Sequence, residues 1–251
     1  MSNIIEISHL NKSFRNKVVL KDLTLHVKDG ENLVILGKSG IGKSVLIKCI
    51  VGLIVPDSGT IRVFDKNISD LSLKELNKVR TRIGFLFQGN ALYDSMSVRE
   101  NLEFPLRKNL KMDNQQKMDM LVQKVLEDVG LPEAADVMPA ELSGGMQKRI
   151  GLARTLILEP EIILYDEPTT GLDPITAGEI NLLINRIQKH RKTSSIIITH
   201  DKESAKLTGD RIVILNEGNI FVEGTYEELV KKTDIPFIRS FFMNHTQKTI
   251  N

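Results

Sequence analysis

A glycine-rich segment at residues 37–44 carries the pattern with the clearest chemical meaning in this chain. It matches G-x-x-x-x-G-K-[ST] at every fixed position. Glycines let the backbone curl so that successive N–H groups point at phosphate oxygens, and a following helix adds its positive end. We predict that Lys43 reaches the β- and γ-phosphates of ATP and that Ser44 binds Mg²⁺. The predicted cofactor-binding residues here are Gly37, Lys38, Ser39, Gly40, Ile41, Gly42, Lys43, Ser44 and Val45.

The segments on either side of these glycines support a phosphate site. Residues 33–36 form a continuous apolar run, typical of a strand buried on both faces, and a helix is expected from about Lys43. A glycine-rich turn without a ligand is the alternative, and it requires neither element. The strand–loop–helix order therefore favours the phosphate site.

Two carboxylates end a second apolar run. Residues 162–165 read Ile-Ile-Leu-Tyr, and Asp166 and Glu167 follow directly. Ligands of open α/β folds bind at the carboxyl ends of the strands. We predict that Asp166 holds Mg²⁺, through water, and that Glu167 orients and deprotonates an attacking water. Strands often end in acidic residues, so this prediction depends on the glycine-rich segment.

Residues 142–149, Leu-Ser-Gly-Gly-Met-Gln-Lys-Arg, predict a second anion site. Ser143 is suited to cap a helix, and Gly144 and Gly145 expose backbone N–H groups at its positive end. An ordinary capped helix is the alternative. The segment, however, resembles the L-S-G-G-Q signature of the ABC ATPase superfamily, and the resemblance covers nearly the whole chain.

The resemblance implies roles for further residues. Phe14 would stack on adenine, with simple strand packing as the alternative, and Gln88 would contact Mg²⁺ and couple the core to a helical insert. Asp173 would belong to the D-loop, and His200 would lie near the γ-phosphate. The implied catalytic residues are Lys43, Gln88, Glu167 and His200; the implied metal ligands are Ser44, Gln88 and Asp166; and Ser143, Gly144, Gly145 and Asp173 join the nucleotide-binding set.

The same resemblance implies how the chain works with partners. In this family each ATP lies between the P-loop of one copy and the signature of the other, so a homodimer is expected in the ATP-bound state. Integral-membrane permease subunits would dock near residues 88–94. Hydrolysis and product release would then open the dimer and drive the permease.

Three local features resemble the ATPases of Mla-type systems, which work with Mce-domain lipid-binding proteins and move phospholipids between two membranes. They are Met146 in the signature, residues 89–106 after Gln88, and residues 173–176. In that group the chain often continues G-A-L-F after the glutamine, and Asn90 and Tyr93 depart from this pattern. An ATPase for another importer or exporter, of amino acids, metals or lipoproteins, is the alternative.

A soluble ABC protein acting on nucleic acid or the ribosome is a third hypothesis. Such proteins usually carry two ATPase domains, a long coiled coil or a zinc insertion. This chain has a single P-loop, one cysteine and a net charge of only +2. We therefore expect no nucleic-acid partner.

The elements that must position these residues follow from apolar periodicity. Short strands are expected around residues 5–27, helices at 71–82 and 113–129 with Asp113 as the cap of the second, a strand at 195–198, a helix at 176–189 and a hairpin at 211–222. Alternating strands and helices indicate an α/β fold with a mostly parallel sheet. The resemblance adds an N-terminal antiparallel β subdomain and an inserted helical subdomain.

The expected organisation is a single ABC nucleotide-binding domain over residues 1–251. Its α/β core covers 1–88 and 159–233, its helical subdomain 89–158, and its C-terminal helix and tail 234–251. The phenylalanine-rich stretch 234–243 packs either on its own domain or on a partner, and 244–251 is expected to be a polar tail.

Composition limits where the chain acts. Apolar residues make up 41% of its 251 residues and charged residues 26%, a balance typical of globular proteins. The single Cys49 lies in an apolar helical stretch and is expected to pack rather than react. No signal-peptide pattern or apolar run of about 20 residues is present. We expect a peripheral protein at the cytoplasmic face of the inner membrane.

Overall fold

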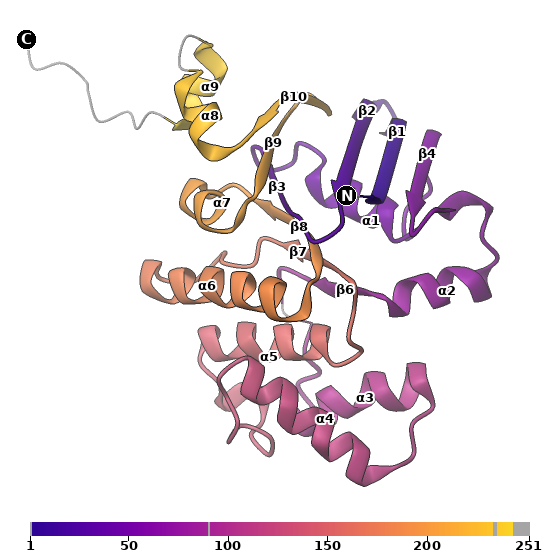
Figure 1. The fold of residues 1–251 in the computed structure, drawn as a ribbon, viewed down its shortest axis with the longest axis vertical. Helices are drawn as coiled ribbons and strands as arrows, with labels where there is room; N and C mark the ends of the chain where they lie inside the picture. Colours follow the sequence, from indigo (N-terminus) through magenta and orange to yellow (C-terminus); the bar gives the residue numbers. More distant parts are fainter. Residues whose placement is uncertain (1, 90, 233–234, 243–251) are drawn as a thin grey trace, which may run out of the picture.

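The computed structural model describes residues 2–89, 91–232 and 235–242 and contains two sheets (Figure 1). The smaller sheet is antiparallel, with strand order β2-β1-β4-β5. Its members are β1 (Asn3–Phe14), β2 (Lys17–Lys28), β4 (Ser58–Val63) and β5 (Lys66–Asn67). The expected short strands before residue 28 are instead two strands of 12 residues each. Register shifts between β1 and β2 break the alternation of apolar residues, which is why the sequence shows several short runs.

The larger sheet lies under the predicted nucleotide site. Its strand order is β10-β9-β3-β8-β7-β6, and every pair is parallel except β10 with β9. The residues of β3, β7 and β8 are all buried, as their continuous apolar runs predict. The strands are β3 (Asn32–Leu36), β6 (Ile83–Leu86), β7 (Ile162–Asp166), β8 (Ser194–Thr199), β9 (Arg211–Asn216) and β10 (Asn219–Gly224).

Helices cover the parallel sheet and extend beyond it. In Figure 1, α5 lies between α6 and the pair α3–α4, at the end of the molecule far from the antiparallel sheet. The helices are α1 (Lys43–Ile50), α2 (Leu73–Thr81), α3 (Val98–Leu110), α4 (Gln115–Asp128), α5 (Gly144–Leu156), α6 (Pro174–Arg191), α7 (Lys202–Thr208), α8 (Tyr226–Lys231) and α9 (Pro236–Phe242), with 3-10 turns η1 (Ile68–Asp70) and η2 (Pro139–Glu141). Within the described residues, no helix is long and apolar enough to cross a membrane.

The two faces of β3 belong to two separate apolar cores. Val34 and Leu36 pack with the α3–α6 helices, whereas Leu33 and Ile35 pack with α1 and the antiparallel sheet. Successive side chains of a strand point to opposite faces, so one five-residue strand contributes to both cores. This fixes the position of the loop that follows β3.

The helix predicted over 113–129 is present as α4 (Gln115–Asp128), but its cap is not the one expected. Helix α4 begins at Gln115, and the side chain of Asn114, not Asp113, accepts the N–H of Lys117 at 3.0 Å. The cap must directly precede the first helical residue to reach that N–H. Met118, Val122, Val125 and Leu126 form the buried stripe, and Gly130 follows at φ 73°.

The C-terminal helix α9 packs on its own chain. Ile238 is fully buried, the rings of Phe237 and Phe221 lie 4.7 Å apart, and those of Phe242 and Tyr226 lie 5.5 Å apart. These contacts show that the described residues of α9 pack on the chain's own domain; packing on a partner stays the second expectation. The expected polar tail at 244–251 lies outside the described residues.

Candidate nucleotide site

A cavity of about 440 Å³ lies at the carboxyl ends of β3, β6, β7 and β8. It gathers residues from the glycine-rich loop, the acidic strand end and two other loops. All six catalytic and metal-binding residues expected from the sequence therefore meet at one place, as strand ends in an open α/β sheet should. The lining residues are Val19, Ser39, Gly40, Gly42, Lys43, Ser44, Val45, Gln88, Asp166, Glu167, Thr170 and His200.

The glycine-rich loop requires glycine where it enters helix α1. Gly42 has φ 112°, and a Cβ there would lie 2.8 Å from the carbonyl oxygen of Val19. The side chain of Lys43 folds back along the loop and donates to the carbonyls of Gly37 at 2.7 Å and Lys38 at 3.2 Å. The loop therefore holds its ammonium in a fixed position beside the cavity.

Electrostatics around Lys43 favour an anionic ligand. The side chain is 6% exposed, and burial lowers the pKa of its ammonium, while the charges of Glu167 and Asp166 act in the opposite direction. A buried ammonium is costly unless charge compensates it. A phosphate group in this cavity would provide such charge in a hydrogen-bonding position.

Oxygen donors suited to Mg²⁺ lie side by side at the start of α1. The hydroxyl of Ser44 donates to Oδ1 of Asp166 at 3.1 Å, and Gln88 lines the same cavity. Burial raises the pKa of Asp166, and the nearby charge of Glu167 adds to this effect. A cation there would stabilise the ionised carboxylate. Mg²⁺ is bound in proteins through one or two carboxylates together with phosphates, so this donor set fits it.

Glu167 is held by three neighbours. Its Oε2 atom lies 2.8 Å from Nδ1 of His200 and accepts from Oγ1 of Thr170 at 3.2 Å, while Oε1 lies 3.7 Å from Nζ of Lys43. Its backbone has φ 53°, in the left-handed region that non-glycine residues rarely occupy. Such backbone strain concentrates at functional sites, where surrounding contacts hold it. The carboxylate is thus fixed at the cavity wall.

The signature residues lie in a second cavity that shares no residue with the first. Ser143, Gly144, Gly145 and Asp173 line this space of about 340 Å³. Ser143 caps α5 by accepting the N–H of Met146 at 3.3 Å. The chain therefore does not bring its own signature to its own glycine-rich loop. A Cβ at Gly145 would lie 2.6 Å from Cγ2 of Thr176, so the side chain of Thr176 would have to move to accept it.

Phe14 is placed at the end of β1 with its ring accessible. It is 45% exposed, and the Nζ of Lys12 lies 5.3 Å from its ring centroid. Phe14 is not among the residues that line the nucleotide cavity, so its adenine-stacking role stays a prediction.

Sequence reasoning missed three residues at the site. Val19 and Thr170 line the cavity, and Lys148 on α5 donates to the carbonyl of Gln88 at 2.6 Å. Val19 lies in a strand pattern that gave no sign of a ligand. For Lys148 a signal was available, because it shares one face of its helix with apolar Leu152 and Leu156.

Cys49 has the structural role expected from its sequence context. It is 1% exposed, and burial raises the pKa of its thiol to about 11. A thiol with that pKa is almost entirely protonated at neutral pH and is a poor nucleophile.

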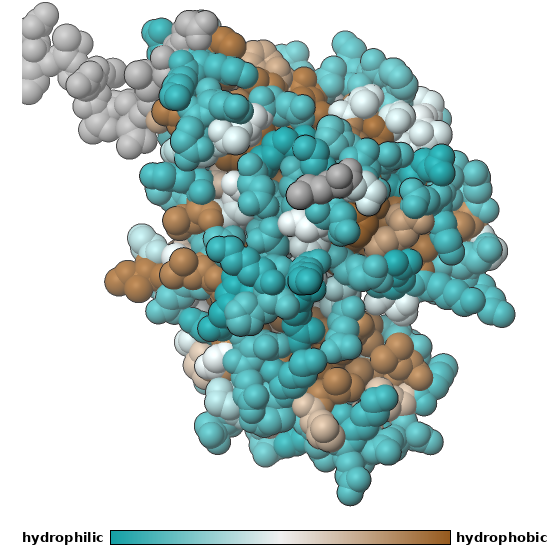
Figure 2. All heavy atoms as spheres, in the orientation of Figure 1, coloured by the Kyte–Doolittle hydropathy of each residue, from teal (hydrophilic) through white to brown (hydrophobic). Residues whose placement is uncertain are grey.

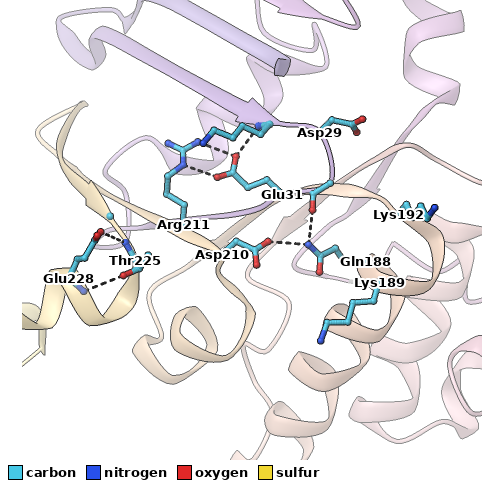
Figure 3. Close-up of a pocket in the computed structure, with 12 residues that line it drawn as sticks. Asp29, Glu31, Gln188, Lys189, Lys192, Asp210, Arg211, Thr225 and Glu228 are labelled. Atoms are coloured by element: carbon cyan, nitrogen blue, oxygen red, sulfur yellow. Dashed lines mark hydrogen bonds and ion pairs between the residues drawn. The ribbon is translucent and has the colours of Figure 1, made fainter. Parts of the chain in front are cut away.

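The larger cavity, of about 890 Å³, lies at the opposite edge of the parallel sheet (Figure 3). It contains none of the predicted site residues. Its polar groups bond to one another: Arg211 pairs with Glu31, and Gln188 donates to Asp210 at 3.0 Å. Size therefore does not identify the functional site here, whereas the chemistry of the lining residues does.

Comparison with known proteins identifies the family. The family model described as "ABC transporter" matches residues 20–170, more than half of the chain. This chain belongs to the ABC transporter family. The match includes the glycine-rich loop, the signature and the acidic strand end, so the family predicted from the sequence is confirmed.

Relatives of this ABC ATPase match it over nearly its whole length. The intermembrane phospholipid transport system ATP-binding protein MlaF of Haemophilus influenzae is 39% identical over 94% of this chain and 89% of its own. MlaF of Escherichia coli is 35% identical over 96% of this chain and 89% of its own. The probable ribonucleotide transport ATP-binding protein mkl of Mycobacterium leprae is 39% identical over 96% of this chain and 69% of its own.

Solved structures support the same fold. The dimeric ATP-binding cassette MJ0796, in a post-hydrolysis state bound to ADP and Pi, has a TM-score of 0.80 at 32% identity, covering 88% of this chain and 98% of its own. The cbiO1 protein of Clostridium perfringens has a TM-score of 0.84 at 30% identity, over 96% of this chain and 98% of its own. The predicted α/β fold is confirmed, and the chain is an ABC-type ATP hydrolase.

Proposed function

We propose that this ABC ATPase powers phospholipid transport between an inner and an outer membrane through a partner permease. The observation that carries the proposal is a cavity that gathers Lys43, Ser44, Gln88, Asp166, Glu167 and His200, in a chain that matches two MlaF proteins over nearly its full length. Met146 in the signature and the segment after Gln88 agree with it, because both resemble the Mla-type group.

Hydrolysis at this site follows from the placement of its residues. The loop N–H groups and Lys43 hold the phosphates of ATP, and Glu167 accepts a proton from the attacking water. As water oxygen bonds to the γ-phosphorus, the bond to the bridging oxygen breaks, and ADP and phosphate leave. Mg²⁺, held by Ser44, Asp166 and Gln88, would neutralise charge on the phosphates. His200 keeps the carboxylate of Glu167 aimed at the cavity.

The working unit is a homodimer with two composite ATP sites. The separation of the glycine-rich loop from Ser143, Gly144 and Gly145 within one chain supports this, since the second cavity is available to a partner's nucleotide. The dimeric cassette MJ0796 is a structural precedent. Asp173 caps α6 beside the signature, where it would face the partner copy.

The permease would contact the segment after Gln88. Tyr93 is 42% exposed there, and Phe87, directly before Gln88, is 38% exposed. Apolar side chains at a surface are candidates for an interface. Figure 2 shows that hydrophobic atoms on the visible face occur in separate patches within a mostly hydrophilic surface.

The complex would also include an Mce-domain lipid-binding protein. The ATPase would lie at the cytoplasmic face of the inner membrane, without a nucleic-acid partner.

A different transported molecule is the second candidate. The methionine import ATP-binding protein MetN of Clostridium tetani is 37% identical over 90% of this chain and 70% of its own. Its similarity is close to that of the two MlaF proteins. The ATP chemistry would be the same in both cases, and the permease would decide the substrate.

Affinity purification from detergent-solubilised membranes of the source tests the proposal. Mass spectrometry of the eluate should identify a permease, an Mce-domain protein and phospholipid. A permease with an amino-acid-binding partner would overturn the lipid assignment and keep the ATPase. Tyr93→Glu should lose the permease, whereas Met120→Glu, at a 74% exposed apolar residue on α4, should retain it.

A further inference from the structure

Lys148 is a buried cation that the reaction described above does not use. It lies on α5, five residues after the signature cap Ser143, and it is 4% exposed. Its Nζ donates to the backbone carbonyl of Gln88 at 2.6 Å. A buried ammonium is retained only where its surroundings compensate the cost of desolvation, so this contact is a specific one.

The ammonium also lies in the field of the acidic strand end. Burial lowers the pKa of Lys148, and the charges of Asp166 and Glu167 act in the opposite direction. Lys43 shows the same pattern from the glycine-rich loop. Two buried lysines from different elements thus lie in the field of the two carboxylates, and of these two only Lys148 comes from the signature helix.

Other contacts hold the segment that follows Gln88 at its far end, around Tyr93. The amide of Asn101 on α3 accepts the N–H of Tyr93 at 2.8 Å and donates to the carbonyls of Tyr93, Met96 and Ser97, each at 3.0 Å. The guanidinium of Arg154, also on α5, lies 5.0 Å from the ring centroid of Tyr93. Helix α5 therefore contacts the chain around Gln88 and Tyr93 twice. Lys148 bonds to Gln88, and Arg154 lies over the ring of Tyr93.

From this arrangement we infer that Lys148 is a positioning residue that ties the backbone of Gln88 to the signature helix. A displacement of α5 moves the carbonyl that its ammonium holds, and the side chain of Gln88 moves with its backbone. The orientation of the signature in one composite site is thereby linked to the placement of a metal-contacting residue in the other. The inference rests on the proposed homodimer with composite ATP sites.

Replacement of Lys148 by methionine keeps the length of the side chain and removes its donor and charge. In the full chain we expect Lys148→Met to raise the Mg²⁺ concentration for half-maximal ATP hydrolysis severalfold and to lower kcat about tenfold, the effect of one lost charge-assisted hydrogen bond. The affinity for a fluorescent ATP analogue in EDTA should stay within about twofold of wild type, because Lys43 and the loop are unchanged. A merely structural role of Lys148 would weaken the Mg²⁺ response and the affinity for the analogue together.

Arg154→Met is the matched control, since it removes the other contact of α5 with this segment, at Tyr93, and leaves the bond from Lys148 to Gln88 in place. It should leave the Mg²⁺ midpoint at the wild-type value. Lys148→Arg keeps a donor and a charge and should restore at least part of the Mg²⁺ response. It also provides a test if Lys148→Met fails to fold, because a folded arginine variant should show a smaller shift in the same direction.

Two results would overturn the inference. One is a wild-type Mg²⁺ midpoint and kcat in folded Lys148→Met. The other is a loss of nucleotide affinity in EDTA as large as the loss of kcat, which would place Lys148 in phosphate binding. Failure of the proposed dimer has a different signature, namely wild-type protein that binds the analogue and stays monomeric at every concentration of ATP and Mg²⁺.

Discussion

The Nδ1 atom of His200 lies 2.8 Å from the Oε2 atom of Glu167, across the ends of the neighbouring strands β8 and β7. The other carboxylate oxygen faces Nζ of Lys43 at 3.7 Å. Glu167 therefore joins three elements that lie far apart in the sequence. Its position depends on a histidine, a lysine and the hydroxyl of Thr170, and each of these contacts leads to a measurable expectation.

Removal of His200 should slow hydrolysis without abolishing ATP binding. His200→Ala leaves Glu167 without the ring that aims it, and we expect kcat to fall at least about tenfold with little change in KM. Phosphate release under saturating Mg²⁺-ATP measures this. His9→Ala is the control, because His9 also lies 2.8 Å from a carboxylate, that of Asp22, but at the surface of the antiparallel sheet. Equal rates for the two variants would rule out this role.

Lys43 should matter mainly for binding. Lys43→Ala removes the ammonium that the carbonyls of Gly37 and Lys38 hold beside the cavity, so affinity for ATP should fall about tenfold or more. Fluorescence titration with a labelled nucleotide measures it. Lys48→Ala changes a lysine of the same helix outside the cavity and should bind normally. Wild-type affinity in Lys43→Ala would contradict the assignment of the glycine-rich loop as the phosphate site.

Ser143 should be required for dimer closure and not for folding. Ser143→Arg places a long cation in the second cavity, so ATP-dependent dimers should be lost while the monomer stays folded. Size-exclusion chromatography with light scattering detects the difference. Ser72→Arg removes an equivalent helix cap on α2, at a cost of about 1 kcal/mol, and should still dimerise. An ATP-dependent dimer in Ser143→Arg would count against composite sites.

The ion pair at the opposite edge of the sheet predicts a pH dependence of stability. Arg211 donates to both carboxylate oxygens of Glu31, at 2.7 and 3.1 Å. Burial acts to raise the pKa of Glu31, but the bonds and charge of Arg211 hold it below its usual 4.5. The pair's stabilisation is therefore complete above pH 4.5 and is lost as pH falls through the folded-state pKa.

Arg211→Met should consequently lower the free energy of unfolding by about 3 kcal/mol at pH 7, because it leaves a carboxylate buried without its partner. Urea titrations of wild type and variant at pH 7 and pH 4 measure the free energy of unfolding of each protein. The difference between wild type and variant should shrink at the lower pH. A difference that is constant or grows toward low pH would show that Glu31 is not stabilised in this way.

Local sequence was sufficient wherever one short segment carries the whole signal. The phosphate loop, the acidic end of β7 and the signature cap at Ser143 each depend on a few adjacent residues, and each lies where its pattern predicts. The glycine-rich loop and the acidic end of β7 meet in one cavity, because parallel strands end at the same edge, whereas Ser143 lies in a second cavity. The role of each residue in catalysis stays a prediction.

Features that depend on distant contacts were not predicted from the sequence. Helix α3 continues through Pro105, a residue that usually marks a helix boundary, because buried Leu102 and Leu106 anchor it in the core. The bond from Lys148 to Gln88 spans 60 positions, and no periodicity encodes it. Asp113 and Asn114 are adjacent and both can cap a helix, so the sequence does not show at which of them α4 begins. The structure places the cap at Asn114.

The central claim is that this chain hydrolyses ATP with Glu167 as the general base. The most direct test compares phosphate release by wild type and Glu167→Gln at saturating Mg²⁺-ATP, with bound nucleotide quantified in the same samples. We expect the variant to retain ATP in a stable dimer and to lose hydrolysis by a factor of about 100 or more. Hydrolysis at the wild-type rate in Glu167→Gln would contradict the account.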